Sequence, residues 1–149
     1  MIKKKIAIIS LIFFLTNCGF SPIYIKNTDV NFSIENVIYT GDRDLNDFLR
    51  PNLNQYKNDE NDNKIYIEAN SAYRKIILSK DAAGEVASYQ LEAEVLFLIK
   101  PLNEKIKITE KKIMNSMDDK FEEARQERSI KQNFASSITS KLSSKLIIN

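Results

Sequence analysis

The stretch "LSKDAAGEVASYQLEAEVLFLI", residues 78–99, joins a turn sequence to a long alternating run. Asp81-Ala82-Ala83-Gly84 supplies the turn, and Gly84 accepts the positive φ that tight hairpin turns require. Between Val86 and Lys100 the odd positions are apolar almost throughout, whereas the even side begins Gln90, Glu92, Glu94. An apolar period of two predicts a strand with one buried face. The stretch therefore predicts the turn and second arm of a β-hairpin.

Three further strands are predicted outward from this hairpin. Lys64–Lys80 is rich in Ile and Tyr and forms the first arm, and after a turn at Pro101–Glu104 a strand runs to about Asn115. Upstream, Asn31–Tyr39 alternates and predicts an N-terminal strand. Phe32, Ile34 and Ile38 are predicted on one face, and Ser33, Glu35 and Tyr39 on the other.

Two helices are predicted from capping residues and apolar spacing. Asp42 is placed to cap a helix through Leu45, Phe48 and Leu49, which we expect Pro51 to bend or end, although Leu53 and Tyr56 continue its apolar pattern. Asp118-Asp119 is placed to cap the final helix. We expect that helix to dock on the sheet through Phe121, Ala124, Ile130, Phe134, Ile138, Leu142 and Leu146.

The predicted element order is strand, helix, three strands, helix. This order indicates an α+β or α/β sandwich in which two helices pack on one face of a mixed four-stranded sheet. Strands joined across the first helix should pair in parallel through a right-handed crossover, and the hairpin strands should pair antiparallel. We see no internal repeat, so residues 18–149 are interpreted as one domain.

The N-terminus has the layout of a bacterial secretion signal, with lysines at positions 3–5 and an apolar core from Ile6 to Leu15. That core is shorter than the roughly 20 residues of a membrane span. The only cysteine of the chain, Cys18, follows directly after Thr16 and Asn17. Lipoprotein export attaches a diacylglycerol to such a cysteine and cleaves before it. We therefore interpret residues 1–17 as a lipoprotein signal peptide and residues 18–29 as a lipidated tether.

A second interpretation of Cys18 stays open, in which it is an incidental thiol behind an ordinary signal. Asn17 stands where lipoprotein signals usually have Gly, Ala or Ser. A disulfide within the chain is excluded because there is no second cysteine.

Composition argues against several classes of function. Removing residues 1–17 takes away three lysines and no acid, which leaves 19 basic and 20 acidic residues and a net charge of −1. The basic character thus belongs largely to the signal, and no nucleic-acid partner is expected. The chain has no histidine and no glycine-rich phosphate loop. Glu92 and Glu94 resemble paired carboxylates, but no histidine, cysteine or glycine-rich loop accompanies them. They are better interpreted as the solvent side of a strand, and no enzyme is expected.

"CGFSPIY", residues 18–24, resembles the start of mature alphaproteobacterial LPS-assembly lipoproteins, the LptE family. The match comprises Cys18, Gly19, Phe20, Pro22, Ile23 and Tyr24. A second resemblance lies in the hairpin, where family members have a glycine at the tip followed by a small residue, Tyr and Gln. Gly84, Ser88, Tyr89 and Gln90 fit that pattern.

The resemblance implies a protein anchored in the inner leaflet of the outer membrane, by a diacylglycerol and an N-acyl chain such as palmitate on Cys18, with no other cofactor. It implies that the domain faces the periplasm and plugs the lumen of an LptD-type β-barrel. The two proteins together would place lipopolysaccharide (LPS) in the outer leaflet. A different class of function stays open, namely a free-standing periplasmic-facing lipoprotein that binds a small ligand or an envelope structural partner.

The resemblance also directs attention to basic residues near the hairpin and near the start of the last helix, because LPS is anionic. The candidates for contact with LPS or the partner are Arg74, Lys75, Lys80, Lys120, Arg125 and Arg128. Each of them could equally be an ordinary solvated charge. Phe20, Pro22 and Tyr24 are candidate anchors of the tether, because two aromatic rings so close to a membrane need a packing partner.

Overall fold

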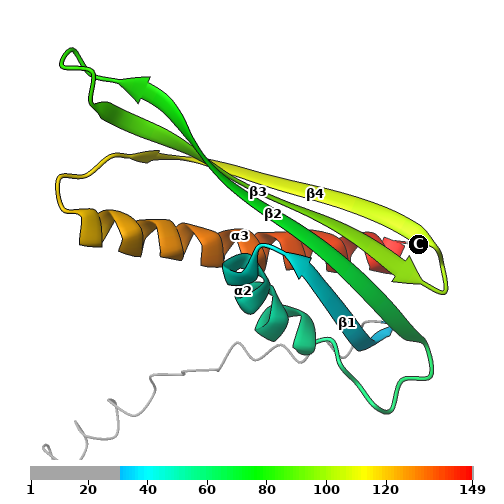
Figure 1. The fold of residues 1–149 in the computed structure, drawn as a ribbon. Helices are drawn as coiled ribbons and strands as arrows, with labels where there is room; N and C mark the ends of the chain where they lie inside the picture. Colours follow the sequence, from blue (N-terminus) through cyan, green and yellow to red (C-terminus); the bar gives the residue numbers. More distant parts are fainter. Residues whose placement is uncertain (1–30, 149) are drawn as a thin grey trace, which may run out of the picture.

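The computed structural model describes residues 31–148, with side chains as far as Ile147 (Figure 1). Its elements are β1 (Ser33–Gly41), α2 (Arg43–Asn54), β2 (Lys64–Lys80), β3 (Val86–Lys100), β4 (Glu104–Asn115) and α3 (Lys120–Ile148). The predicted signal peptide (1–17) and the tether (18–29) lie outside the described residues, as do the predicted roles of Cys18, Phe20, Pro22 and Tyr24.

The four strands form one sheet in the order β1-β2-β3-β4. β1 and β2 pair in parallel across α2, whereas β2–β3 and β3–β4 pair antiparallel. Both helices lie on the same side of the sheet, and the far end of the β2–β3 hairpin extends beyond the start of α3 (Figure 1). The predicted fold class and strand pairing are therefore confirmed, and the sheet order is added.

The core lies between the sheet and the helices. The odd residues of β3 face the helices, and Leu91, Ala93, Val95, Phe97 and Ile99 are all fully buried. From α3, the buried apolar side chains are Ile130, Phe134, Ala135, Ile138 and Leu142. Burying a large aliphatic or aromatic side chain contributes about 1.5–3 kcal/mol, so this apolar layer is the main stabilising feature of the fold.

A β-bulge in β1 overturns the predicted sides of its second half. Ile34 pairs with Ile65 and Asn36 pairs with Tyr66, so Glu35 is one extra residue in β1. A shift of one residue moves every later side chain to the opposite face. As a result Tyr39 packs against the core, and Ile38 is 55% exposed. The predicted faces of these two residues were therefore wrong.

Pro51 lies inside α2 and does not end it, because the helix continues to Asn54. The predicted cap is confirmed, since the Asp42 carboxylate accepts a hydrogen bond of 2.8 Å from the Leu45 N–H. Leu45, Leu49 and Leu53 are all buried. Their packing on the core stabilises the turn that contains Pro51, even though proline removes one backbone donor.

Gly41 marks the point where the chain leaves β1 for α2. Its φ is +91°, in the left-handed region that favours glycine, and a Cβ built on it would lie 1.8 Å from the Ser71 backbone oxygen. No larger residue fits at this point without moving the backbone of β2.

The start of α3 also differs from the prediction. Asp119 caps the helix as expected, by accepting a 2.8 Å hydrogen bond from the Phe121 N–H. However, Phe121 is 74% exposed and Ala124 is exposed, so neither docks on the sheet. The buried residue of this turn is Glu123, which is 5% exposed. The apolar side of α3 therefore begins later, at Ile130.

Candidate functional site

The six predicted basic residues do not gather in one place. Arg74 and Lys75 are consecutive in β2, so their side chains point to opposite faces of the sheet. Lys80 is exposed near the hairpin tip. Lys120, Arg125 and Arg128 belong to the first turns of α3. Only Arg125 and Arg128 line the same surface groove.

Arg74 lies on the side of the sheet away from the helices, here called the open face. It pairs there with Glu92 and, at 3.9 Å, with Glu94. Lys111 binds Glu92 at 3.1 Å and Lys107 binds Glu94 at 2.9 Å. The hydrogen bond from Arg74 lowers the pKa of Glu92. Both glutamates lie on the expected face, but Glu92 is only 7% exposed and so is not solvated as predicted, and basic side chains of β2 and β4 compensate both charges.

Lys75 lies on the opposite side and connects β2 to α3. Its Nζ lies 3.0 Å from Glu123 and 2.9 Å from Glu127. The Tyr73 hydroxyl donates to Glu127 at 2.9 Å. Burial alone would lower the pKa of Lys75, but the hydrogen bonds to Glu127 and Glu123 outweigh it, and the pKa is raised.

Glu123 is the centre of this network, here called the α3 clasp and comprising Lys75, Ser116, Lys120, Glu123 and Glu127. The Met117 N–H, the Ser116 hydroxyl and Lys120 donate to Glu123 at 3.0, 3.1 and 3.1 Å. The Met117 N–H is the largest cause of the low pKa of Glu123, about 2, and the lysines and Ser116 add to it. Lys75 and Lys120 are thus both engaged within the chain.

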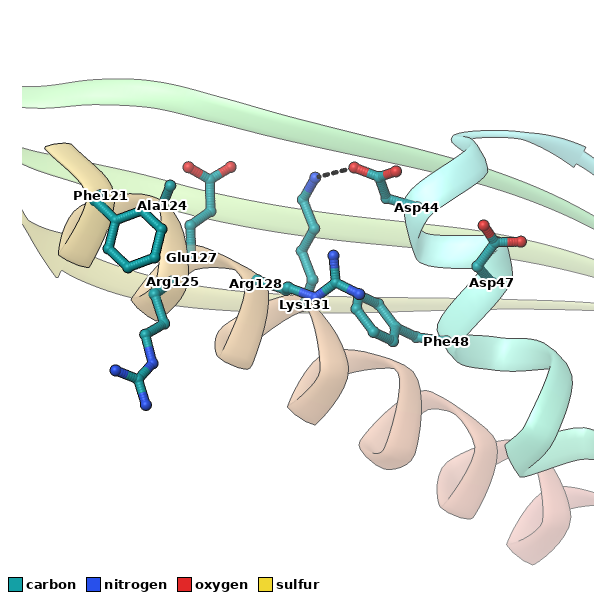
Figure 2. A pocket seen from close by; sticks show the side chains of 9 residues that line it. All are labelled: Asp44, Asp47, Phe48, Phe121, Ala124, Arg125, Glu127, Arg128 and Lys131. Carbon is teal, nitrogen blue, oxygen red and sulfur yellow. Dashed lines mark hydrogen bonds and ion pairs between the residues drawn. The ribbon is translucent and has the colours of Figure 1, made fainter.

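The groove lies between α2 and the first half of α3, with a volume of about 670 Å³ (Figure 2). Phe121, Arg125 and Arg128 line it from α3, whereas Asp44 and Phe48 line it from α2. Because Phe121 and Ala124 are not used in the core, they give this groove an apolar part.

Three cations and three acids line the groove, namely Arg125, Arg128 and Lys131 with Asp44, Asp47 and Glu127. The Arg128 guanidinium lies 5.3 Å from the centre of the Phe48 ring, and Arg125 is 3.5 Å from Glu122. Lys131 lies 3.3 Å from Asp44, and its Nζ is 4.1 Å from the centre of the Tyr73 ring. Figure 2 shows Arg128 beside Phe48 and Arg125 pointing away from α2.

This arrangement can bind an anionic group that carries an apolar part. Guanidinium groups donate paired hydrogen bonds to phosphate or carboxylate, and the exposed Phe121 ring offers an apolar contact beside them. Sequence analysis selected Arg125 and Arg128 but missed Lys131 and assigned Phe121 to the core. The spacing of three and four residues through Phe121, Arg125, Arg128 and Lys131 was the available signal.

A scan against protein-family models gives no match, and a search of curated proteins gives none either. Solved structures do match. Rare lipoprotein B from Shewanella oneidensis has a TM-score of 0.53 and 17% identity, over 74% of this chain and 95% of that chain. A minor lipoprotein from Acinetobacter baumannii has a TM-score of 0.50 and 16% identity, over 74% and 93%. A putative lipoprotein from Caulobacter crescentus has a TM-score of 0.53 and 11% identity, over 80% of this chain and 89% of that chain.

This chain has the fold of these bacterial lipoproteins. At such identities the similarity concerns the fold alone. Within the part of this lipoprotein fold that the structure describes, no three His, Cys, Asp or Glu side chains gather as a metal site. Over the same residues, no helix has the length and apolar content to cross a membrane.

Proposed function

We propose that the chain is an outer-membrane lipoprotein of the LptE type, a subunit of the machine that places LPS in the outer leaflet. The observation that carries this proposal is the combination of a Cys-Gly-Phe start at residues 18–20 with the fold of rare lipoprotein B. The start implies a diacylglycerol and an N-acyl chain on Cys18. The partner is then an LptD-type barrel that the folded domain plugs and supports.

The exterior of the described domain supports a role inside a polar barrel. On the open face, Arg74 and Lys111 pair with Glu92, and Lys107 pairs with Glu94. A surface of compensated charges can lie against the polar, water-filled interior of an outer-membrane barrel at little desolvation cost. The same face also exposes Ile38, Tyr66, Ile76, Leu96 and Ile113, so it offers a partner a mixture of polar and apolar side chains.

Arg125 and Arg128 are the strongest of the basic candidates for contact with anionic LPS. Lys75 and Lys120 each pair with Glu123, and Arg74 pairs with Glu92. Arg125 is 74% exposed, with one pairing of 3.5 Å to Glu122. We expect Arg125→Ala with Arg128→Ala to weaken the binding of labelled LPS by the purified protein, and Lys145→Ala at the far end of α3 to leave it unchanged.

The test of the function is a mild-detergent purification of tagged protein from outer membranes, followed by mass spectrometry. We expect a barrel protein of the LPS pathway to co-purify with the wild type and with the neighbouring control Ser21→Ala. Cys18→Ala should lose both the acyl chains and the barrel. An acylated wild type that purifies alone would contradict the proposal.

The alternative is a free-standing periplasmic-facing lipoprotein that binds a small ligand or an envelope structural partner. The groove between α2 and α3 favours it, because its volume of about 670 Å³ is in the range of compact ligand sites. Under this alternative, the protein purifies without a barrel partner. It also binds a ligand, and the affinity for that ligand falls in the Arg125→Ala, Arg128→Ala variant.

A further inference from the structure

A second groove lies at the opposite end of α3, where β1 begins and β3 turns into β4. It has a volume of about 700 Å³, and its lining comprises the apolar Phe32, Ile65, Leu102, Leu146 and Ile147 and the polar Asn31, Asn63 and Glu104. We call it the terminal groove. Phe32 and Ile65 are buried at 6% and 3% exposure, whereas Leu102 and Ile147 are 60% and 56% exposed. The terminal groove therefore has an apolar part with two uncovered aliphatic side chains on its rim, beside the polar Asn31, Asn63 and Glu104.

The chain enters the described domain through this groove. Asn31, the first described residue, lines it, and the Asn63 side chain donates a 2.7 Å hydrogen bond to the Asn31 carbonyl. The Ser33 N–H donates to the Asn63 carbonyl at 2.8 Å. These two contacts fix the entry point beside Phe32. The described chain therefore begins at the rim of the groove.

The residues just upstream have the composition that such a groove binds. Residues 20–25 read FSPIYI and contain four large apolar or aromatic side chains, Phe20, Ile23, Tyr24 and Ile25. Residues 26–29 read KNTD, and Asn and Asp favour turns. Six residues separate Tyr24 from Asn31, and an extended chain of that length spans about 20 Å. The segment is therefore long enough to reverse and return to the groove.

We propose that residues 20–25 of the same chain fold back and occupy the terminal groove, with Phe20 or Tyr24 against Phe32 and Ile65 and the aliphatic side chains against Leu102 and Ile147. A covalently connected segment binds at a high effective concentration, so a modest apolar contact is enough. A second copy is a poorer occupant, because two rim side chains are a small contact beside the roughly 1,200 Å² that a stable interface buries.

The docking itself does not rest on the proposed function, but its consequence does. If Cys18 is acylated, a docked segment holds the lipid at the end of the domain where α3 finishes. The β2–β3 hairpin tip lies at the other end (Figure 1). The segment would then act as a rigid connector, and not as a loose tether, between the membrane and the domain.

Photo-crosslinking tests this proposal in the full chain purified in detergent. Benzoylphenylalanine replaces Leu102 in one protein and Ile113 in a control, because both residues are 60% exposed and Ile113 lies on β4 away from the groove. After illumination, mass spectrometry of the peptides identifies each adduct. We expect residue 102 to crosslink to residues 20–25 of the same chain and residue 113 not to do so.

Variants of the segment sharpen the test. Phe20→Ser with Tyr24→Ser should lower the intrachain adduct several-fold, and Asn27→Ala should leave it unchanged. Adducts from residue 102 that join two copies, that join another protein, or that do not exceed those from residue 113 would each overturn the docking. None of these outcomes depends on a barrel partner, so failure of the docking is distinguishable from failure of the proposed function.

Discussion

The two halves of α3 contact the sheet by different means. From Ile130 onward the helix packs through buried apolar residues such as Phe134, Ile138 and Leu142. In the first turns the contact is the α3 clasp, in which Glu123 and Glu127 bind Lys75 on β2. Apolar packing tolerates changes of pH and salt, whereas ion pairs respond to both. The difference indicates that the first half can adjust while the second half keeps the domain folded.

The largest expected effect comes from the apolar half. Phe134→Ala removes a ring that is 5% exposed in the native core, and such truncations cost about 3–5 kcal/mol of unfolding free energy. Chemical denaturation should show a lower midpoint with an unchanged slope. The control Ser136→Ala, on the exposed side of the same turns, should stay within about 0.5 kcal/mol of the wild type. Equal effects of the two variants would remove the distinction between the halves.

A smaller effect is expected from the clasp. Glu123→Gln removes the charge that Lys75 and Lys120 share, and the loss of charge-assisted hydrogen bonds costs about 1–3 kcal/mol. We expect a loss of unfolding free energy at the low end of this range, because Lys75 still pairs with Glu127 in the variant. Hydrogen exchange should accelerate mainly in the first turns of α3. Uniform acceleration through Leu142 would contradict a separately held first half.

The clasp should also respond to acid. The pKa of Glu123 is about 2 in the folded chain against an ordinary value of 4.5, so the folded state binds this proton more weakly than the unfolded state. The stabilisation is fully present above the ordinary value and is lost as the pH falls toward 2. The melting temperatures of wild type and Glu123→Gln should therefore differ at about pH 6 and converge toward about pH 3. A gap that stays constant over this range would argue against the ionised clasp.

The smallest effect on stability is expected from Phe121. Because this ring is 74% exposed, Phe121→Ser should change the unfolding free energy by no more than about 0.5 kcal/mol. If the groove between α2 and α3 binds LPS or the partner, the same variant should reduce that binding, whereas Gln126→Ser on an exposed position of the same helix should not. A marked loss of stability in Phe121→Ser would show that the ring packs in the folded chain.

The same contrast explains what the sequence could and could not predict. The bounds of β3 followed from its long alternation after Gly84, because a buried sheet face imposes a strict period, and those of β2 followed from its run of Ile and Tyr before the same turn. The bulge at Glu35 leaves no such signal, since an extra residue in a strand has no characteristic side chain. The apolar period of α3 was correct, but a period does not tell which turns lie beneath packed strands, so Phe121 was assigned to the core. For the candidate site, Arg125 and Arg128 could be predicted from their charge and position in the sequence. That they lie near Lys131 and Phe48 could be seen only in the folded structure.

Gly41 has a consequence for mutational tolerance. A Cβ at this position would overlap the Ser71 carbonyl, whereas a Cβ on Gly84 would meet nothing within 4 Å. Both glycines have positive φ, but only the first is enclosed. In a saturation library Gly84 should accept asparagine or aspartate, which tolerate left-handed backbone. Gly41 should accept no other residue, because the backbone of β2 occupies the space of any side chain there. The end of β1 is therefore fixed in sequence by the fold itself, whatever the protein binds.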